Sequence, residues 1–279
     1  MRSLLIGLMM STAAAADDAS DTPTAEVANR PVRFETTVPV RLDYLLSLPK
    51  DYDRAEDADQ RKWPLVVFLH GAGERGGGLT GDDLESSDLK LVAKHGPPKL
   101  VAAGQRFGFI LAAPQCPDGK WWQPNEVVAL VDHLEQTYRV DPDRIILTGL
   151  SMGGYGTWDT AGYAPDRFAC AVPVCGGADS LAGWHIGTLP IWAFHGRQDP
   201  VVPLAESQHA VEEVNKRGGS AKLTVYDDLQ HDSWTRTYNT PAVFEWMLAQ
   251  RRGQPAIDPA AAAAAAGSDP TTSKAGESE

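Results

Sequence analysis

Short apolar runs that alternate with amphipathic segments restrict the fold of this sequence more than any other feature. Residues 65–69 (Leu-Val-Val-Phe-Leu) are apolar at every position, which is typical of a strand covered on both faces. Other strand-like segments are 42–48, 109–113, 144–148, 169–174, 191–194 and 223–226, and helical patterns between them cover 126–138, 154–164, 204–217 and 242–250. This alternation predicts an α/β fold, a mostly parallel central sheet with helices on both faces.

Length and composition fit one folded domain between two atypical ends. With 279 residues, 43% of them hydrophobic, the chain is large enough for a single core. We assign this domain to residues 31–252. Beyond it, 253–279 begins with prolines, continues with seven alanines at 260–266 and ends in a polar stretch. Because the alanines present no apolar face for packing, we expect this segment to be a disordered tail.

The N-terminus has the order of a secretory signal peptide. Arg2 is followed by the apolar stretch 4–10 and by the alanines 13–16. We therefore expect a signal peptide over 1–16, a flexible lead-in over 17–30 and a secreted or periplasmic location in a bacterium. The alternative is a disordered N-terminus with a chance apolar cluster. The apolar stretch is too short to span a bilayer, so no stable membrane insertion is expected.

Charge and cysteine content argue against several classes of partner. The formal net charge is -12, and no basic run is longer than a pair such as Arg251-Arg252, so a nucleic-acid partner is not expected. The three cysteines form no Cys-x-x-Cys pair and there is no His-rich cluster, so neither a metal nor another cofactor is expected. Cys170 and Cys175 would point to opposite faces of a strand, which favours buried thiols over a disulfide between them.

The segment after the strand at 144–148 has the pattern of a nucleophile elbow. It reads Gly149-Leu150-Ser151-Met152-Gly153 and a helix follows. In a turn this tight, the residues two before and two after the serine must lack bulk, which explains both glycines. The pattern predicts Ser151 as a nucleophile over the carboxyl edge of the sheet, where ligands of such sheets bind. The alternative is an ordinary glycine-rich turn with a capping serine.

The base for this serine is expected after the last strand. In such sheets the chain order is serine, then an acid, then histidine. His231 lies in the loop that follows 223–226 and is our candidate for the base. His195 ends a strand and is expected to be structural, His209 lies within a helix, and His185 is a weaker candidate in a loop.

The acid is expected after the preceding strand. Asp199 lies in the loop that follows 191–194 and would accept the Nδ1–H of His231. Glu206 is an alternative, although it falls in the next helix. Asp199 could also be a helix cap or part of an Asp-Pro turn.

Two backbone amides are needed to hold an oxyanion. One is expected from Met152, the residue after the nucleophile, and the other from the glycine-rich loop at 70–78. Ala72 is our first candidate in that loop and Gly73 the second. The loop lacks the Gly-Lys-Ser/Thr ending of a phosphate-binding loop, which argues against that reading.

Tryptophans stand in two of the same loops. Trp122 follows the strand at 109–113 with Trp121 before it, and Trp234 comes three residues after His231. We expect Trp122 and Trp234 to bind substrate as aromatic walls, but packing of the loops against the core is an equal alternative.

The motifs together resemble the dienelactone-hydrolase-like and prolyl-oligopeptidase-like branch of α/β-hydrolases, above all secreted bacterial carboxylesterases described as predicted peptidases. The stretches that carry the resemblance are 48–52 (LPKDY), 68–76 (FLHGAGERG), 95–98 (HGPP), 113–116 (APQC), 149–156 (GLSMGGYG), 195–203 (HGRQDPVVP) and 231–234 (HDSW). The resemblance implies an α/β-hydrolase fold, a Ser151–Asp199–His231 triad, and ester rather than peptide cleavage, with acetyl- and feruloyl-type esterases among similar proteins. Dienelactone hydrolases proper carry cysteine where this chain has Ser151.

The expected function is therefore cleavage of carboxylic esters through an acyl-enzyme. No insertion between the strands is long enough for a large lid, although 177–188 could cover part of the site, so a short-chain or carbohydrate-linked small ester is the expected substrate. One alternative is a serine peptidase of the prolyl-oligopeptidase-like type, although this length leaves no room for the large propeller domain of those enzymes. A second is a non-catalytic binding protein on the same fold. The oligomeric state is not predicted.

Overall fold

The computed structural model describes residues 33–53, 61–79, 83, 85–178 and 182–267. It divides the chain into two compact units, 1–39 and 40–279. The expected signal peptide at 1–16 and the lead-in at 17–30 lie outside the described residues. All the helices and strands below belong to the second unit.

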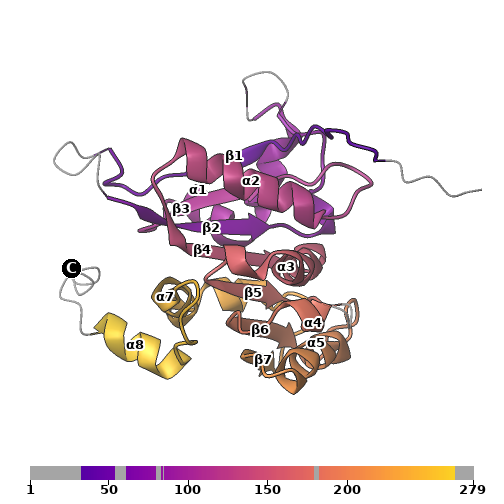
Figure 1. Cartoon of the computed structure of the whole chain (residues 1–279), viewed down its shortest axis with the longest axis vertical. Helices are drawn as coiled ribbons and strands as arrows, with labels where there is room; N and C mark the ends of the chain where they lie inside the picture. Colours follow the sequence, from indigo (N-terminus) through magenta and orange to yellow (C-terminus); the bar gives the residue numbers. More distant parts are fainter. Residues whose placement is uncertain (1–32, 54–60, 80–82, 84, 179–181, 268–279) are drawn as a thin grey trace, which may run out of the picture. The chain divides into compact units, whose positions relative to one another are not determined.

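In the described part of that unit, seven strands form one sheet in the order β1-β3-β2-β4-β5-β6-β7 (Figure 1). The strands are β1 (Tyr44–Ser47), β2 (Trp63–Leu69), β3 (Ile110–Pro114), β4 (Val140–Leu150), β5 (Cys170–Val174), β6 (Ile191–Gly196) and β7 (Ala221–Tyr226). Only the pairing of β1 with β3 is antiparallel. The α/β fold predicted from the alternating pattern is thus confirmed.

The helices pack on both faces of the sheet. The α-helices are α1 (Gly96–Ala102), α2 (Pro124–Thr137), α3 (Met152–Tyr163), α4 (Ala182–His185), α5 (Leu204–Lys216), α6 (Trp234–Tyr238), α7 (Pro241–Ala249) and α8 (Pro259–Gly267). Short 3-10 helices are η1 (Ala72–Glu74), η2 (Asp88–Lys94) and η3 (Pro165–Arg167).

Two cores, one on each face, explain the uninterrupted apolar run of β2. Leu65, Val67 and Leu69 pack in a cluster with side chains of α2, α3 and α5. Val66 and Phe68 point to the other face and pack with side chains of α7 and with residues of α1. Alternate residues of a strand face opposite ways, so a strand covered on both sides needs apolar residues at every position.

Residues 259–267 form a helix, although the sequence led us to expect a disordered tail over 253–279. Helix α8 lies beside α7, and Ala262 is buried against it (Figure 1). The Asp258 carboxylate accepts a hydrogen bond from the Ala260 amide, and Trp246 Nε1 donates to the Ile257 carbonyl at 2.7 Å. Alanine has the best helix propensity, and its small side chain allows close packing without a larger apolar face. Residues 268–279 lie outside the described residues.

Candidate active site

Ser151 stands at a strained turn between β4 and α3. Its backbone has φ 53° and ψ −117°, a conformation that residues with a side chain rarely adopt. A Cβ on Gly149 would lie 2.3 Å from the Gly153 carbonyl oxygen, and one on Gly153 would lie 1.9 Å from the Leu69 carbonyl oxygen. Both glycines are therefore required by the close approach of three backbone segments, as the elbow pattern predicts.

The structure brings Ser151, His231 and Asp199 together. His231 Nε2 lies 3.0 Å from Ser151 Oγ, and His231 Nδ1 lies 2.7 Å from Asp199 Oδ2. The His231 side chain is 19% exposed, whereas that of Asp199 is fully buried. The serine hydroxyl, the imidazole and the carboxylate thus form a continuous hydrogen-bonded path from solvent into the protein.

The Asp199 carboxylate is held in its ionised form. Its Oδ1 accepts hydrogen bonds from the amides of Val201 at 2.8 Å and Val202 at 2.9 Å. Burial by itself raises the pKa of Asp199, but the hydrogen bonds from His231 and these two amides outweigh it and hold the pKa below its ordinary value. The turn geometry considered as an alternative for Asp199 is therefore present as well and orients the carboxylate. Glu206 lies elsewhere, on α5 beside Gly177.

The other candidate histidines do not reach the serine. His195 is buried, with Nδ1 2.7 Å from Ser207 Oγ and Nε2 2.9 Å from the Val202 carbonyl, which fits the structural role expected for it. Burial lowers its pKa. His209 is exposed on α5. His185 lines a cavity at the opposite edge of the sheet.

The two leading candidates for oxyanion donors begin the two helical turns next to Ser151. Met152 is the first residue of α3 and Ala72 the first of η1. Within the described residues, neither amide donates a backbone hydrogen bond. Gly71, just before Ala72, brings the loop against the nucleophile, because its Cβ would lie 3.6 Å from Ser151 Cβ. A Cβ on Gly73 would have no neighbouring atom within 4 Å, whereas one on Gly71 would meet Ser151, and Ala72 remains our first candidate.

His70 fixes this loop, a role that the sequence analysis did not assign. Its Nδ1–H donates to the Gly71 carbonyl at 2.6 Å, and its Nε2 accepts the Cys116 amide hydrogen at 2.9 Å. The ring is fully buried, and burial lowers its pKa to about 4. A neutral imidazole with one N–H and one lone pair meets both bonds, so the buried ring remains uncharged.

The two tryptophans expected to bind substrate have different surroundings. Trp122 is only 5% exposed, its Nε1 donates to the His70 carbonyl at 3.1 Å, and Gly156 packs on its ring. Trp122 is therefore a core residue beneath the loop, in agreement with the packing role that was the equal alternative to a substrate wall. Trp234 is half-buried, and its ring lies edge-on to the His231 ring with centroids 5.3 Å apart. It stands beside the reacting groups, as a wall would.

Cys175 lies next to the triad and shares its backbone strain. Its φ is 41°, and its thiol, one Asp199 oxygen and one His231 nitrogen lie within 4.8 Å of one another. The three could together ligate a metal ion. However, Asp199 and His231 already bind each other, and burial raises the pKa of the Cys175 thiol far above its ordinary value, which keeps it protonated. We assign no metal to this group.

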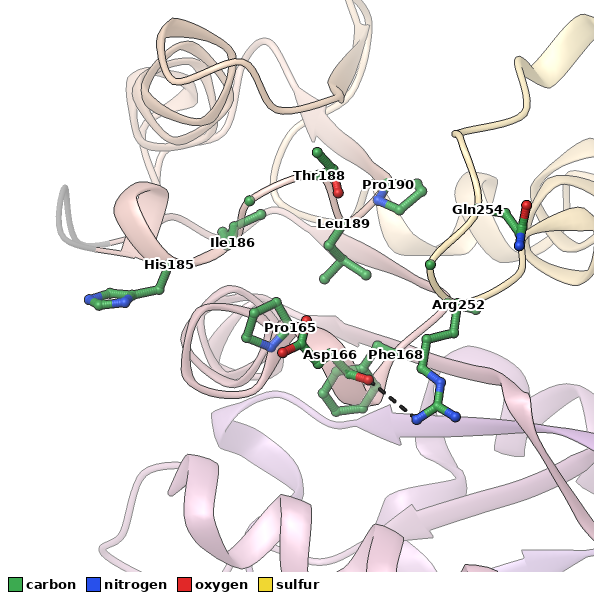
Figure 2. Close-up of a pocket in the computed structure, with 13 residues that line it drawn as sticks. Pro165, Asp166, Phe168, His185, Ile186, Thr188, Leu189, Pro190, Arg252 and Gln254 are labelled. Atoms are coloured by element: carbon green, nitrogen blue, oxygen red, sulfur yellow. Dashed lines mark hydrogen bonds between the residues drawn. The ribbon is translucent and has the colours of Figure 1, made fainter.

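A cavity of about 650 Å³ lies away from these residues (Figure 2). Phe168 and Ala169, just before β5, and Leu189 and Pro190, just before β6, line it. These are the amino ends of the strands, whereas Ser151, Asp199 and His231 all follow carboxyl ends. The cavity and the triad thus belong to opposite edges of the sheet.

Comparisons with known proteins give relatives that act on esters. The profile of the phospholipase/carboxylesterase family matches residues 122–242. A thermostable esterase of known structure is 34% identical, with a TM-score of 0.59, over 75% of this chain and 59% of its own. Poly(3-hydroxyalkanoate) depolymerase C of Paucimonas lemoignei is 28% identical over 131 residues, which are 41% of this chain and 28% of that protein. The chain therefore spans less than two thirds of either relative.

A peptidase shares the fold as well. The acylaminoacyl peptidase of Pyrococcus horikoshii is 16% identical with a TM-score of 0.52, over 82% of this chain and 43% of its own. At that identity the likeness concerns the fold alone. Among the described residues, none of the helices is both long and apolar enough to cross a bilayer.

Proposed function

We propose that this chain, which has the α/β-hydrolase fold, is a serine hydrolase of carboxylic esters. The observation that carries the proposal is the path from Ser151 Oγ to His231 Nε2 at 3.0 Å and from His231 Nδ1 to Asp199 Oδ2 at 2.7 Å. A serine hydroxyl is a weak nucleophile unless a base takes its proton as it attacks. The path provides that base and the carboxylate that orients it.

The geometry supports a two-step acyl transfer. His231 Nε2 takes the hydroxyl proton while Ser151 Oγ attacks the ester carbonyl carbon, and Asp199 stabilises the imidazolium that forms. The imidazolium then gives this proton to the departing alcohol, which leaves the acyl group on Ser151. A water molecule, deprotonated by His231 in the same way, attacks the acyl-enzyme and releases the acid.

The negative charge that develops on the carbonyl oxygen needs donors already in place. The amides of Met152 and Ala72 are our candidates, because each flanks Ser151 and neither donates a backbone hydrogen bond in the described chain. Met152 also starts α3, whose N-terminus carries partial positive charge. Fixed donors of this kind are worth about 3–4 kcal/mol each in transition-state stabilisation.

An ester is favoured over a peptide as substrate. The relative with 34% identity is an esterase, and the profile that matches 122–242 describes phospholipases and carboxylesterases. We propose a short-chain or carbohydrate-linked ester of the acetyl or feruloyl type. The polyester-cleaving relative gives a third ester class to test.

The expected export is proposed together with this activity. Removal of 1–16 after Ala16 would deliver the enzyme to the periplasm or the medium, where glycan-linked esters are accessible. Sequencing the N-terminus of the protein recovered from each fraction tests this, and an intact Met1 in the cytoplasm would contradict it.

The activity is tested with Ser151→Ala. We expect wild type to hydrolyse p-nitrophenyl acetate and to label with a fluorophosphonate probe, and the variant to lose both while its circular dichroism spectrum is unchanged. His231→Ala should lose several orders of magnitude in kcat, whereas the exposed His209→Ala should not change it. Full activity of Ser151→Ala would contradict the proposal.

A parallel panel separates the substrate classes. Acetylated and feruloylated sugars, a hydroxyalkanoate oligomer and chromogenic peptides are compared by kcat/KM. Preference for peptides would favour the peptidase alternative, and a wild type that neither labels with fluorophosphonate nor turns over any of these substrates would favour a binding protein.

A further inference from the structure

A line of side-chain contacts leads from Glu74 through His95 and Trp234 to His231. Glu74 Oε1 lies 3.7 Å from His95 Nε2, and Trp234 Nε1 donates to His95 Nδ1 at 3.3 Å. The Trp234 ring in turn contacts the ring of His231, with centroids 5.3 Å apart and planes at 89°. The line therefore joins the loop that offers Ala72 to the base.

Glu74 anchors the first end of this line. Its side chain is 7% exposed, and its carboxylate lies under Gly71, where Oε2 would be 3.2 Å from an added Cβ. The Glu74 carbonyl also accepts a hydrogen bond from Gln115 Nε2 at 2.8 Å. A buried carboxylate with these neighbours cannot move without moving the loop that holds Ala72.

The hydrogen bonds of His95 define its tautomer. Because Nδ1 accepts the indole hydrogen of Trp234, Nδ1 carries no proton, and the ring proton is on Nε2, which faces Glu74. The His95 ring also lies edge-on to the Trp234 ring, with centroids 5.3 Å apart. His95 is thus the acceptor that sets the rotation of the indole.

The backbone at His95 is held independently of its side chain. Gly96 has φ 65°, and a Cβ there would lie 2.4 Å from the Phe68 ring. The ring of His95 is partly exposed and contributes no cap to α1. A substitution of His95 is therefore expected to leave the local fold in place. Its side chain must have a role other than holding the backbone.

We propose that His95 is a positioning residue that holds the Trp234 ring against His231, with Glu74 as its anchor. The proposal rests on the function proposed above. By fixing the indole, His95 restricts the rotation of the His231 imidazole and sets one wall of the space in front of Ser151. It touches no reacting atom itself and acts through Trp234.

Three variants test the line. His95→Leu removes the acceptor and should lower kcat for p-nitrophenyl acetate about tenfold, the effect of one lost orienting hydrogen bond, with a smaller change in KM. His95→Gln should stay within about threefold of wild type, since an amide can accept from Trp234 and donate to Glu74. Trp234→Phe keeps an aromatic ring, although a smaller one, but loses the N–H, and should match His95→Leu. His209→Leu is the matched control.

The double variant decides whether one bond is involved. His95→Leu combined with Trp234→Phe should be no slower than either single variant, because both remove the same hydrogen bond. Effects that multiply, or a His95→Gln as slow as His95→Leu, would overturn the proposal. A lower denaturation midpoint with unchanged kcat in all variants would also overturn it, since that is the result of a purely structural role.

A second readout keeps this inference separate from the proposed function. The indole N–H resonance of Trp234, assigned by its loss in Trp234→Phe, should move in His95→Leu and remain in place in His95→Gln. If wild type neither labels with fluorophosphonate nor turns over any ester, the proposed function fails. If it does both, and the resonance does not respond to His95, only the positioning role fails.

Discussion

The two edges of the central sheet differ in what surrounds the strand ends. At the carboxyl edge, Ser151 and Cys175 have left-handed backbones, and buried polar groups are matched to one another over short distances. At the amino edge lies the cavity of about 650 Å³ with Phe168, Leu189 and Pro190 in its wall (Figure 2). In the described part of the chain, this cavity thus lies at one edge of the sheet and the hydrogen-bonded Ser151, His231 and Asp199 at the other.

The direction of the chain explains this difference. Parallel strands send their carboxyl ends into the N-termini of helices, where free N–H groups and positive partial charge meet a ligand. The amino ends receive loops from helix C-termini, which offer carbonyl groups instead. Ligands of such sheets bind beyond the carboxyl ends of the strands, so the size of this cavity alone is a poor guide to the site.

The largest expected effect is that of Asp199→Asn at the carboxyl edge, which should lower kcat far more than stability. The amide can still accept from Val201 and Val202, but its NH2 group would face His231 Nδ1 and favour the tautomer with hydrogen on Nε2. His231 could then no longer accept the proton of Ser151. We expect kcat to fall about 10⁴-fold.

Steady-state kinetics and a denaturation curve check this together. The free energy of unfolding is expected to change far less than the activation free energy. A variant with a lower free energy of unfolding, whose folded molecules retain the wild-type kcat, would contradict this prediction. Asp199 would then have a structural role alone.

Phe168→Ala should produce the opposite result at the amino edge. Phe168 is 1% exposed and belongs to the core on the α2, α3 and α5 face, so its truncation enlarges the existing cavity. We expect a loss of about 3–5 kcal/mol in the free energy of unfolding. Urea denaturation measures it, and kcat of the folded enzyme should remain near the wild-type value. A large drop in kcat would mean that this cavity serves the reaction.

A smaller effect concerns the dependence of stability on pH at the carboxyl edge. The pKa of His70 is about 4 in the folded chain and 6.5 when unfolded, because burial disfavours the charged ring. As the pH falls from 6.5 to 4, His70 therefore binds a proton in the unfolded chain but stays neutral in the folded chain. The contribution of His70 is constant above that window and lost progressively within it, by about 2 kcal/mol between pH 7 and pH 5.

Urea unfolding of the wild type and of His70→Asn, each at pH 7 and pH 5, isolates the contribution of His70 to the pH dependence of stability. The variant is expected to be less stable at pH 7 but to lose less on acidification. His195, whose pKa burial also lowers, remains in both proteins and adds the same slope to each. Equal slopes in the two proteins would show that His70 is solvated or charged.

The sequence alone predicts those elements that a short local pattern of residues encodes. Each strand predicted from an apolar run is present, because burial on both faces leaves a run such as 65–69 with no alternative. The grouping of Ser151, Asp199 and His231 was foreseeable too, since each follows the carboxyl end of a strand and such ends meet at one edge.

Other features depend on contacts that no local pattern records. Trp121 and Trp122 are adjacent, yet the first is 57% exposed and the second 5%. The bond between Trp234 and His95 joins residues 139 positions apart. In helix α8 the alanines lack an apolar stripe, and their packing depends on the size of the side chain, which a hydropathy pattern does not weigh. Each of these is settled by tertiary packing.

The crowding around Gly149 and Gly153 has a consequence for how this site can diversify. No room exists for even one methyl group at either position, since backbone atoms stand 2.3 Å and 1.9 Å away. At position 151 the turn requires only a residue that can adopt a φ of 53°. The atom that attacks can therefore be exchanged by a single substitution, while the turn that presents it cannot. In descendants of this sequence, new reactivity should be more accessible than a new way of presenting it.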